Sequence, residues 1–288
     1  MRQQVVLITG ATAGIGRDAA LRLARAGHRV FATGRKKEAL QELQAAAAGL
    51  PLETLVLDVN DGATIDAAKT ELDYQTNGYG IDVLINNAGY GQIGPVLGVS
   101  DERVRAQYET NVFGLLSVTR AFTPAMMSRG AGRIINISSV GGRISSPFMG
   151  VYTSTKFALE SLSDAMRVEL APFGVKVIVV EPGYIRTNFT GTALDSLGAA
   201  SVGTPWEAMA GRVDSVLARF EATASEPEAV TRVLERIIAS SSPRARYIAP
   251  WWNVFGLAVL WVPTRLADQL IRMAMGLNVA AHPQTSAT

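Results

Sequence analysis

The 288-residue sequence contains no cysteine, and this absence removes several kinds of chemistry at once. Disulfides, thiolate metal sites and cysteine nucleophiles all require that residue. Histidine is almost as scarce, since only His28 and His282 are present. A histidine-rich metal site or a Ser-His-Asp triad therefore has few candidates, and we expect no bound metal.

Basic runs and long apolar runs are missing as well. The formal net charge is +2 and no Lys/Arg-rich stretch resembles a nucleic-acid-binding arm, so we expect no nucleic-acid partner. The apolar run "WWNVFGLAVLWVP", residues 251–263, is shorter than the roughly 20 residues of a membrane-spanning helix, and the N-terminus has no signal-peptide core. These features predict a globular, cytoplasmic protein.

Short apolar runs alternate with helical patterns from the N-terminus to about residue 250. Runs such as "VVLI", "DVLINN" and "KVIVVEP" are apolar nearly throughout, which is typical of parallel strands covered on both faces. The sequence therefore predicts an α/β fold, a single Rossmann-type doubly wound parallel sheet of about seven strands with helices on both faces. Helices are expected near residues 15–26, 37–48, 61–76, 101–129, 152–172 and 227–240.

Two regions interrupt this rhythm and define the predicted domain organisation. Residues 183–226 are rich in Gly, Ser and Thr, and a connection of this length is typical of a substrate lid. Residues 251–288 form an apolar C-terminal extension, expected to be helical and interrupted by Pro263. We therefore predict a dinucleotide-binding catalytic domain over residues 1–250, which includes the lid, followed by the extension.

The stretch "TGATAGIG", residues 9–16, lies between the first predicted strand and the first predicted helix. Gly10, Gly14 and Gly16 allow a sharp turn and a close approach of peptide N–H groups to a ligand, and the following helix directs the positive end of its dipole outward. A pyrophosphate fits this description. Because the spacing is G-x-x-x-G-x-G, a merely tight strand-to-helix turn is the alternative.

The end of the second predicted strand bears on the choice of dinucleotide. It reads "ATGRKK" and lacks the Asp or Glu that accepts hydrogen bonds from the ribose hydroxyls in NAD sites. Arg35, helped by Lys36 and Arg17, can instead pair with a 2′-phosphate, so NADP(H) is favoured over NAD(H). The alternative is that Arg35 and Lys36 are solvated residues at the start of a helix. Asp58, at the end of the third strand, is placed to hold an adenine amino group.

A tyrosine and a lysine form the candidate catalytic pair. Tyr152 and Lys156 are four residues apart in a predicted helix and therefore share one face. A phenol has an ordinary pKa of about 10, and a neighbouring ammonium stabilises the phenolate. We expect Lys156, together with the positive nicotinamide of a cofactor, to lower the pKa of Tyr152 so that the phenol acts as a general acid/base. The strand "RIINIS" ends in Ser138 and is followed by Ser139, and both hydroxyls are candidates for the same crevice.

Together these motifs resemble the short-chain dehydrogenase/reductase family. The segments "TGATAGIG", "NNAG", "NVFG", "SSVGG", "YTSTK" and "EPG" occur in that family's order and spacing between residue 4 and about residue 190. The stretch around Tyr152 is most similar to the hydroxysteroid and retinol dehydrogenase branch. The resemblance implies an oxidoreductase acting on CH–OH or C=O groups, and a homodimer or homotetramer in which the helices at 101–129 and 152–172 pair across a dimer.

The resemblance also implies a role for each matching residue. Ser139 would hydrogen-bond the substrate oxygen, Tyr152 would be the general acid/base, and Lys156 would bind the nicotinamide ribose. Asn111 would order a water in a proton relay. The residues implied in cofactor binding are Gly10, Thr12, Ala13, Gly14, Ile15, Gly16, Arg35, Asp58, Val59, Asn87, Ala88, Gly89, Tyr152, Lys156, Pro182, Gly183, Ile185 and Thr187.

The substrate side of the crevice is apolar. Phe148, Met149 and Phe189 would form a wall suited to a bulky lipophilic alcohol or ketone of the steroid, retinoid or long-chain type, with ordinary packing of the lid as the alternative. Two other functions stay open from the residues. They are reduction of a 3-ketoacyl thioester in lipid synthesis, and sensing of a dinucleotide without turnover.

The C-terminal extension has three interpretations. It can close over the substrate, pack in an oligomer interface, or lie on a membrane surface as a peripheral contact. Tryptophan and arginine suit the boundary between lipid and water. The residues that would make a membrane contact are Trp251, Trp252, Trp261, Arg265 and Arg272.

Overall fold

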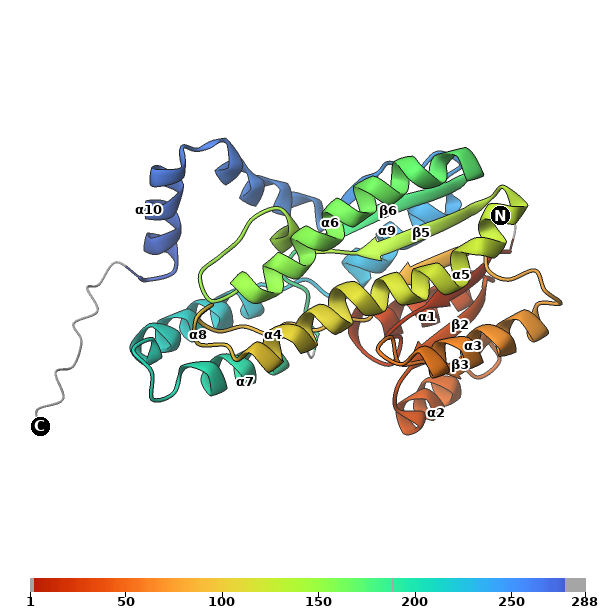
Figure 1. Cartoon of the computed structure of the whole chain (residues 1–288), viewed down its shortest axis with the longest axis horizontal. Coiled ribbons are helices and arrows are strands. Elements are labelled where there is room, and N and C mark those ends of the chain that lie inside the picture. The colour runs from red at the N-terminus through yellow and green to blue at the C-terminus, as the bar shows by residue number, and fades with distance from the viewer. Residues whose placement is uncertain (1–2, 188, 278–288) are drawn as a thin grey trace, which may run out of the picture.

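A seven-stranded parallel sheet forms the centre of the molecule (Figure 1). The structure is a computed structural model that describes residues 3–187 and 189–277. The strand order is β3-β2-β1-β4-β5-β6-β7, which confirms the predicted doubly wound sheet. The strands are β1 (Val5–Ile8), β2 (Arg29–Gly34), β3 (Leu52–Val56), β4 (Val83–Asn86), β5 (Gly132–Ile137), β6 (Val175–Pro182) and β7 (Arg246–Ala249).

Successive residues of each strand are buried on opposite faces of the sheet because side chains alternate along a strand. In β1, Val6 and Ile8 pack in one hydrophobic cluster and Leu7 packs in the other. In β4, Ile85 joins the first cluster and Leu84 the second. Both faces therefore require apolar side chains, which is why these strands read as continuous apolar runs.

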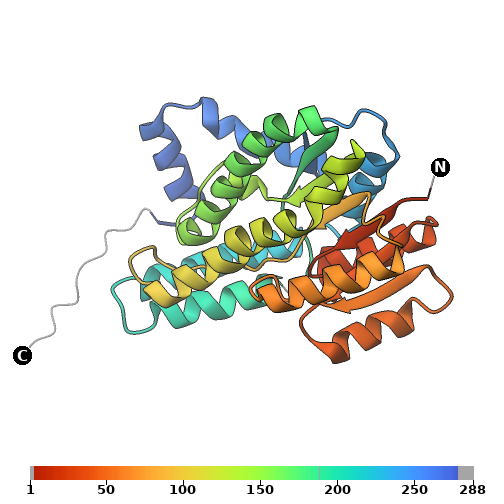
Figure 2. The same ribbon diagram turned by 45° about the vertical axis from the view of Figure 1, so that its right-hand side comes forward.

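Helices cover both faces of the sheet, as Figures 1 and 2 show. One layer consists of α1 (Gly14–Arg25), α2 (Lys37–Ala46) and α9 (Glu228–Ala239). The other consists of α3 (Gly62–Gln75), α5 (Leu115–Arg129) and α6 (Gly150–Leu170). These bounds agree with the sequence prediction to within about two residues, because each helix has an amphipathic pattern and faces a sheet.

The helix expected over residues 101–129 is interrupted. It consists of α4 (Asp101–Tyr108), a π-helical turn η1 (Glu109–Gly114) and α5. Gly114 lies so close to Val59 that an added Cβ would be 2.8 Å from Val59 Cγ2. A π turn accommodates one extra residue without changing the apolar pattern on either side, so periodicity alone did not predict it.

The connection expected to be a lid contains two helices, α7 (Phe189–Ser201) and α8 (Glu207–Ala222). Leu197, Val213 and Leu217 from these helices form a separate hydrophobic cluster with Ile93 and Met275. Met275 follows α10 (Thr264–Ala274), so the end of the described chain packs on the lid helices.

The segment after β7 runs through a 3₁₀ helix, η4 (Trp251–Trp261), and reaches α10 after Pro263. The sequence prediction of helices interrupted at this proline is confirmed. In Figures 1 and 2, α10 lies at the same end of the molecule as α7 and α8, away from the N-terminus. Two further 3₁₀ turns are η2 (Val140–Gly142) and η3 (Ala171–Phe173).

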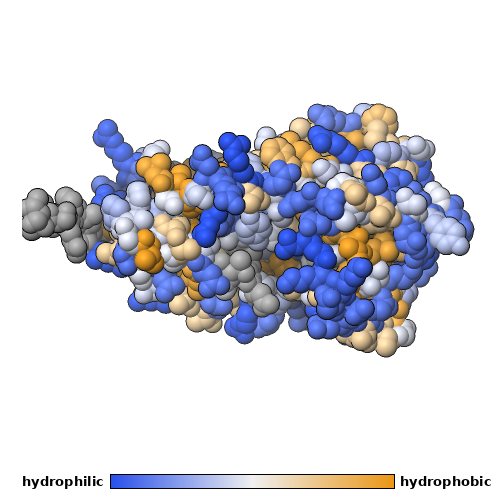
Figure 3. All heavy atoms as spheres, turned by 60° about the horizontal axis from the view of Figure 1, so that its bottom comes forward, coloured by the Kyte–Doolittle hydropathy of each residue, from blue (hydrophilic) through white to orange (hydrophobic). Residues whose placement is uncertain are grey.

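The face seen in Figure 3 is largely hydrophilic, and its hydrophobic groups gather in separate small patches. Such a surface is ordinary for a folded domain in water. Within the described part of the chain, every helix is too short or too polar to cross a lipid bilayer.

Candidate active site

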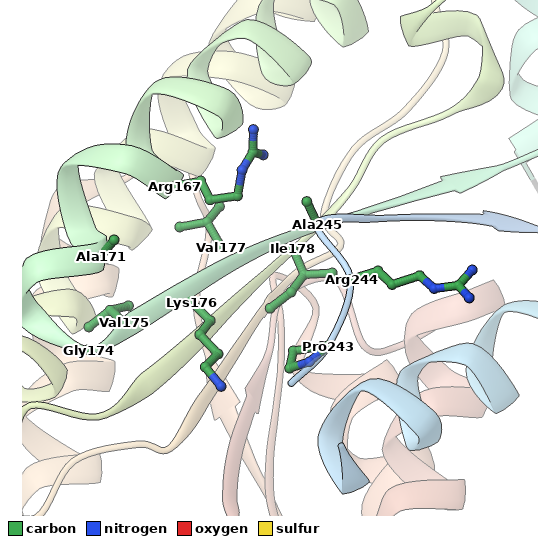
Figure 4. Close-up of a pocket in the computed structure, with 10 residues that line it drawn as sticks. All are labelled: Arg167, Ala171, Gly174, Val175, Lys176, Val177, Ile178, Pro243, Arg244 and Ala245. Atoms are coloured by element: carbon green, nitrogen blue, oxygen red, sulfur yellow. The ribbon is translucent and has the colours of Figure 1, made fainter. Parts of the chain in front are cut away.

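A shallow groove of about 350 Å³ lies between the start of β6 and the segment before β7. Figure 4 shows three basic side chains around it, Arg167, Lys176 and Arg244, with charged ends that point away from one another. Arg167 is paired with Asp164, and Lys176 donates to the Ser241 carbonyl. The groove is at the amino ends of the strands, away from the loops that carry the sequence motifs, so we place the candidate site at the opposite edge.

At the carboxyl edge, the loop after β1 is tied to the loop after β4. Thr9 Oγ1 accepts hydrogen bonds from the backbone N–H groups of Asn87 and Ala88, both at 3.0 Å. The Asn87 side chain donates in return to the carbonyls of Thr9 and Gly10, also at 3.0 Å. The glycine loop is therefore tied to the motif "NNAG" through the Thr9 hydroxyl and through the carbonyls of Thr9 and Gly10.

The glycines of this loop make room for a close approach of backbone. Gly10 and Gly14 have φ of +63° and +52°, a region that side chains disfavour. A Cβ at Gly16 would lie 2.4 Å from the Gly10 carbonyl oxygen and 2.5 Å from Asn87 Nδ2. The residue before α1, Ala13, provides no side-chain cap for the first N–H groups of that helix. A phosphate fits this bare, positively polarised helix end, alongside the neighbouring residues Thr12 and Ile15.

The adenine side of the site is more open. Arg35 directly follows β2 and is exposed. Burial raises the pKa of the Tyr90 phenol, and the nearby charge of Arg35 offsets part of that rise. Thr12 packs against Gly34 at the end of the same strand. Asp58 is half-buried and accepts a hydrogen bond from the Asn60 backbone N–H at 3.0 Å. The predicted adenine and ribose-phosphate residues thus lie along the ends of β2 and β3.

Ser139 and Tyr152 meet at the centre of the edge. Ser139 is the residue before the η2 turn, where its hydroxyl accepts from the Gly141 N–H at 3.0 Å. The same hydroxyl hydrogen-bonds the Tyr152 phenol. Ser138 Oγ lies next to Gly142 instead, since a Cβ added to Gly142 would be 2.8 Å from that oxygen. The structure therefore brings Ser139, rather than Ser138, to the tyrosine.

Lys156 is buried one helical turn beyond Tyr152. Its ammonium donates to the Ile137 carbonyl at 2.9 Å and lies 5.9 Å from the centre of the Tyr152 ring. Gly89 faces the same ammonium, since a Cβ there would be 3.9 Å from Lys156 Nζ. The loops after β4 and β5 and the first turns of α6 therefore converge on these two side chains.

Burial dominates the protonation of this pair. It raises the pKa of Tyr152 to about 12, although the Ser139 hydrogen bond acts in the opposite direction. Burial also lowers the pKa of Lys156 to about 8, against the attraction of the Glu160 carboxylate. The protein's own groups therefore raise the Tyr152 pKa, because the Lys156 ammonium is directed at the Ile137 carbonyl and desolvation of the phenolate is the larger effect. The predicted lowering relies also on the positive charge of a nicotinamide and stays a prediction.

Asn111 lies inside the π-helical turn η1 and its side chain is fully engaged. Nδ2 donates to the Tyr90 carbonyl and to Thr155 Oγ1, both at 3.1 Å. Oδ1 accepts from the Tyr90 N–H at 3.2 Å. The side chain thus holds the loop after β4 against α6. Because its polar atoms already have partners, the backbone of the π turn would have to order the predicted water.

The nicotinamide side follows β6. Pro182 ends the strand, and Gly183 is covered by Asn253 of η4, with an added Cβ only 2.3 Å from Asn253 Nδ2. Ile185 is buried and bridges to Ser225 in a parallel pairing. Thr187 packs against Gly14 of the glycine loop, where an added Cβ would be 3.0 Å from Thr187 Cγ2. This contact brings the start of the lid next to the predicted phosphate site.

The predicted apolar wall is only partly a free surface. Phe148 is 7% exposed and packs in the lid cluster together with the half-buried Met149. Phe148 also has a φ of +66°, and its carbonyl accepts from the Gly94 N–H at 2.7 Å. This packing agrees with the alternative in the sequence analysis, and the role of Phe148 in substrate binding stays a prediction. The Phe189 side chain lies outside the described residues.

Sequence reasoning missed two tyrosines at this edge. Tyr90 supplies the backbone groups that hold Asn111. Tyr184 stacks on Phe220 of α8, with ring centres 4.7 Å apart, and its phenol is near enough to raise the Tyr152 pKa further. Both tyrosines stand directly after a recognised motif, "NNAG" and "EPG" respectively, and that adjacency was the available signal.

Substitution of Gly16 by Ala is expected to weaken NADPH binding by at least about tenfold, because the Gly10 carbonyl and Asn87 would have to move. A fluorescence titration of NADPH measures the effect. Gly211→Ala is the matched control, since nothing lies within 4 Å of a Cβ added at that helical position. Equal affinities in the two variants would show that the loop does not hold the dinucleotide.

Substitution of Lys156 by Met is expected to abolish activity and to raise the free energy of unfolding at pH 7 by about 3 kcal/mol. The charged form is destabilised by burial, which displaces its pKa from 10.5 to about 8. Below pH 8 the buried lysine is charged, and this lowers the free energy of unfolding of the wild-type protein. As pH rises from 8 toward 10.5 the folded protein releases this proton, so the stability advantage of the variant must shrink over that range.

Urea unfolding between pH 7 and pH 10.5 measures this difference. Lys37→Met, at an exposed position of α2, is the control and should show no such pH dependence. A Lys156→Met variant that is less stable than the wild type at pH 7 would contradict the prediction.

Comparison with known proteins agrees with this geometry. The family model described as short chain dehydrogenase matches residues 4–197. The 3-ketodihydrosphingosine reductase of Bacteroides thetaiotaomicron is 32% identical over 279 residues, covering 95% of this chain and 98% of that protein. The human 17-beta-hydroxysteroid dehydrogenase type 1 is 36% identical over 267 residues, covering 86% of this chain and 77% of that protein.

A solved structure of serine dehydrogenase, in its closed form complexed with NADP⁺, has a similar fold. The TM-score is 0.72 at 30% sequence identity, and the match covers 85% of this chain and 93% of the other. The family match spans the strands β1 to β6 and the loops that follow them as far as residue 197. The resemblance inferred from the motifs is confirmed: the chain belongs to the short-chain dehydrogenase family, whose members are oxidoreductases that act on CH–OH and C=O groups.

Proposed function

We propose that this oxidoreductase uses NADP(H) to interconvert a carbonyl group and a secondary alcohol on a bulky lipophilic substrate. The observation that carries the proposal is the hydrogen bond between Ser139 and Tyr152, with the buried Lys156 one turn away. These three side chains face the glycine loop across the carboxyl edge of the sheet. A dinucleotide-sensing protein would have no use for this constellation.

The residues present fit a dinucleotide. The backbone of Gly10 to Gly16 would hold the pyrophosphate, Asp58 and Val59 the adenine, and Asn87, Ala88 and Gly89 the adjoining ribose. Pro182, Gly183, Ile185 and Thr187 would border the nicotinamide. When bound, the cofactor supplies or accepts a hydride at its nicotinamide C4.

Proton movement is the task of the protein. The Tyr152 phenol is protonated at neutral pH because its pKa is about 12, so it can donate to a carbonyl oxygen as that oxygen gains negative charge. Ser139 would hold the same oxygen and then stabilise the phenolate through the hydrogen bond already present. The Lys156 ammonium offsets the phenolate charge, and below pH 8 it is mostly protonated. The backbone of Asn111 would order the water through which the proton is replaced.

Arg35 supports the choice of NADP(H). It is an exposed cation at the end of β2, and the residues beside it in the strand are Thr33 and Gly34 rather than an acid. A guanidinium pairs with a phosphate through two parallel hydrogen bonds, which suits the 2′-phosphate of NADP(H). The similar fold of a serine dehydrogenase solved with NADP⁺ agrees with this assignment.

The lipophilic substrate is supported by the lid. Met149, Tyr184 and Trp206 belong to the partly buried border of the lid cluster, and Tyr184 directly follows Gly183 of the predicted nicotinamide site. An apolar pocket with few polar groups favours a large apolar substrate, oriented by Ser139 and Tyr152. Two relatives act on such molecules by name, one on a ketodihydrosphingosine and one on a hydroxysteroid.

We also propose a homodimer through α5 and α6. Phe113 in the η1 turn before α5 is 52% exposed, and Phe157 and Val168 on α6 are 44% and 72% exposed. These large apolar side chains lie on the outer side of the two helices predicted to pair. Burying them against a second copy would remove apolar area from water.

Substitution of Tyr152 by Phe is expected to lower kcat for the reduction of a long-chain ketone by at least about 100-fold while NADPH still binds, because only the proton donor is removed. NADPH absorbance measures turnover and NADPH fluorescence measures binding. Tyr74→Phe is the control, since Tyr74 is 81% exposed on α3. Unchanged turnover in Tyr152→Phe would overturn the assignment of the proton donor.

Substitution of Arg35 by Ser is expected to lower kcat/KM for NADPH by about 10- to 100-fold, the cost of one charge-assisted contact. The value for NADH should change less than about twofold, because that cofactor lacks the 2′-phosphate. The control is Arg25→Ser at the exposed end of α1. Parallel losses with both cofactors would show that Arg35 does not read the phosphate.

A further inference from the structure

The segment after β7 exposes an unusual amount of apolar surface. Nineteen large apolar side chains are exposed among the described residues, and nine of them lie between Trp251 and Met273. Trp251, Trp252 and Trp261 are 67%, 52% and 91% exposed. Leu257 is the one buried residue that η4 has. A contiguous exposed patch of this kind marks a contact with another molecule or a membrane.

The helix α10 has two apolar faces. Ile271 on one face packs in the lid cluster, with Met275 one turn further on. Leu266, Leu270 and Met273 lie on the opposite face, because a helix turns by about 100° per residue, and they are between 43% and 57% exposed. The first face explains why α10 lies where it does, whereas the second has no such explanation within the described chain.

The charge pattern of this segment indicates the kind of surface it meets. Residues 251–264 contain no charged side chain. In α10, Arg265 and Arg272 flank the exposed apolar face, and Asp268 is the one acidic residue between positions 251 and 275. Tryptophan rings combine an apolar body with an N–H donor and suit the boundary between lipid and water. Cations at the edge of an apolar strip attract anionic headgroups.

A second copy of the chain fits the same surface less well. A two-fold contact places each patch against itself, so Arg265 and Arg272 would approach the same residues of the partner. The more ordinary apolar candidates for self-association, Phe113 and Phe157, lie in η1 and on α6 instead. The charge arrangement therefore favours a lipid surface over a protein copy.

We propose that residues 251–274 dock the protein on an anionic lipid surface, with the three tryptophans at the headgroup boundary and the two arginines facing the headgroups. The docking surface adjoins the active site, since Asn253 of η4 covers Gly183 at the end of β6. On the proposed function, a lipophilic substrate would then reach the site from the lipid phase. The docking itself does not depend on that activity.

Flotation of the full chain with vesicles tests the proposal. Vesicles of phosphatidylcholine with phosphatidylglycerol are compared with vesicles of phosphatidylcholine alone. The wild-type protein should float with the anionic vesicles, and the combined variant Trp251→Ser/Trp252→Ser/Trp261→Ser should bind them at least about tenfold more weakly. Leu97→Ser, at a position 85% exposed elsewhere on the surface, is the control and should bind like the wild type.

The arginines are tested separately. Arg265→Gln/Arg272→Gln should weaken binding to anionic vesicles and reduce its salt dependence, with little change for phosphatidylcholine. Absence of wild-type binding to either vesicle would overturn the proposal. A tryptophan variant that floats normally but changes the molar mass in light scattering would overturn it in favour of a second copy.

Activity separates this proposal from the proposed function. The tryptophan variant should reduce a short, water-soluble ketone with NADPH at the wild-type rate, because none of the three residues is part of the catalytic machinery. If the wild type floats but reduces no ketone, the docking holds and the proposed function fails. Loss of soluble-ketone turnover in a variant that still floats would show that this segment closes the active site instead of docking.

Discussion

The burial of one ammonium group beside a phenol is the constraint on which the site depends. Lys156 is 7% exposed, and its ammonium has the Ile137 carbonyl as a close acceptor and the Glu160 carboxylate as a nearby charge. Glu160 in turn accepts from Arg246 of β7, which also pairs with Glu181 of β6. A buried cation is tolerated only when such partners surround it. Side chains from β6, β7 and α6 therefore form the charged network next to Lys156.

The order of the strands decides which loops can contribute to this arrangement. The strand order reverses between β1 and β4, and the loops after these two strands therefore diverge to opposite faces and leave a crevice between them. Thr9 and Gly10 in the first loop are joined to Asn87 and Ala88 in the second by four hydrogen bonds. The carboxyl ends of β5 and β6 then add Ser139 and Pro182 on the side where the substrate would lie, within 3.5 Å of each other.

The parts of this picture that could be predicted from sequence are those governed by periodicity and by residue type. Apolar runs located all seven strands, and the four-residue spacing of Tyr152 and Lys156 placed them on one face of α6. The choice between Ser138 and Ser139 could not be made from the residues, because it depends on which hydroxyl the η2 turn directs toward α6. The π turn at Asn111 was equally invisible, since an inserted residue leaves the apolar pattern intact on both sides.

Burial bears on two of the predictions. Phe148 is predicted as a substrate contact because it is aromatic and near Tyr152, and in the structure the lid cluster encloses it. The pKa of Tyr152 is predicted to fall through Lys156 and a nicotinamide charge, whereas the protein's own groups raise it because the loss of hydration outweighs the nearby ammonium. Sequence spacing predicts which ionisable groups are neighbours. The sign of a pKa shift depends in addition on how much water remains around those groups in the folded protein.

Several costly features of the molecule lie at the carboxyl edge of the sheet. The buried Lys156, the left-handed Phe148 and the crowded glycines at 10, 14 and 16 would each destabilise an ordinary domain. They are tolerated because the sheet behind them is packed with apolar side chains on both faces, most completely in the central strands β1 and β4. Strain of this kind is not needed for folding, so its presence in the loops around Ser139 and Tyr152 supports the proposed placement of the chemistry there.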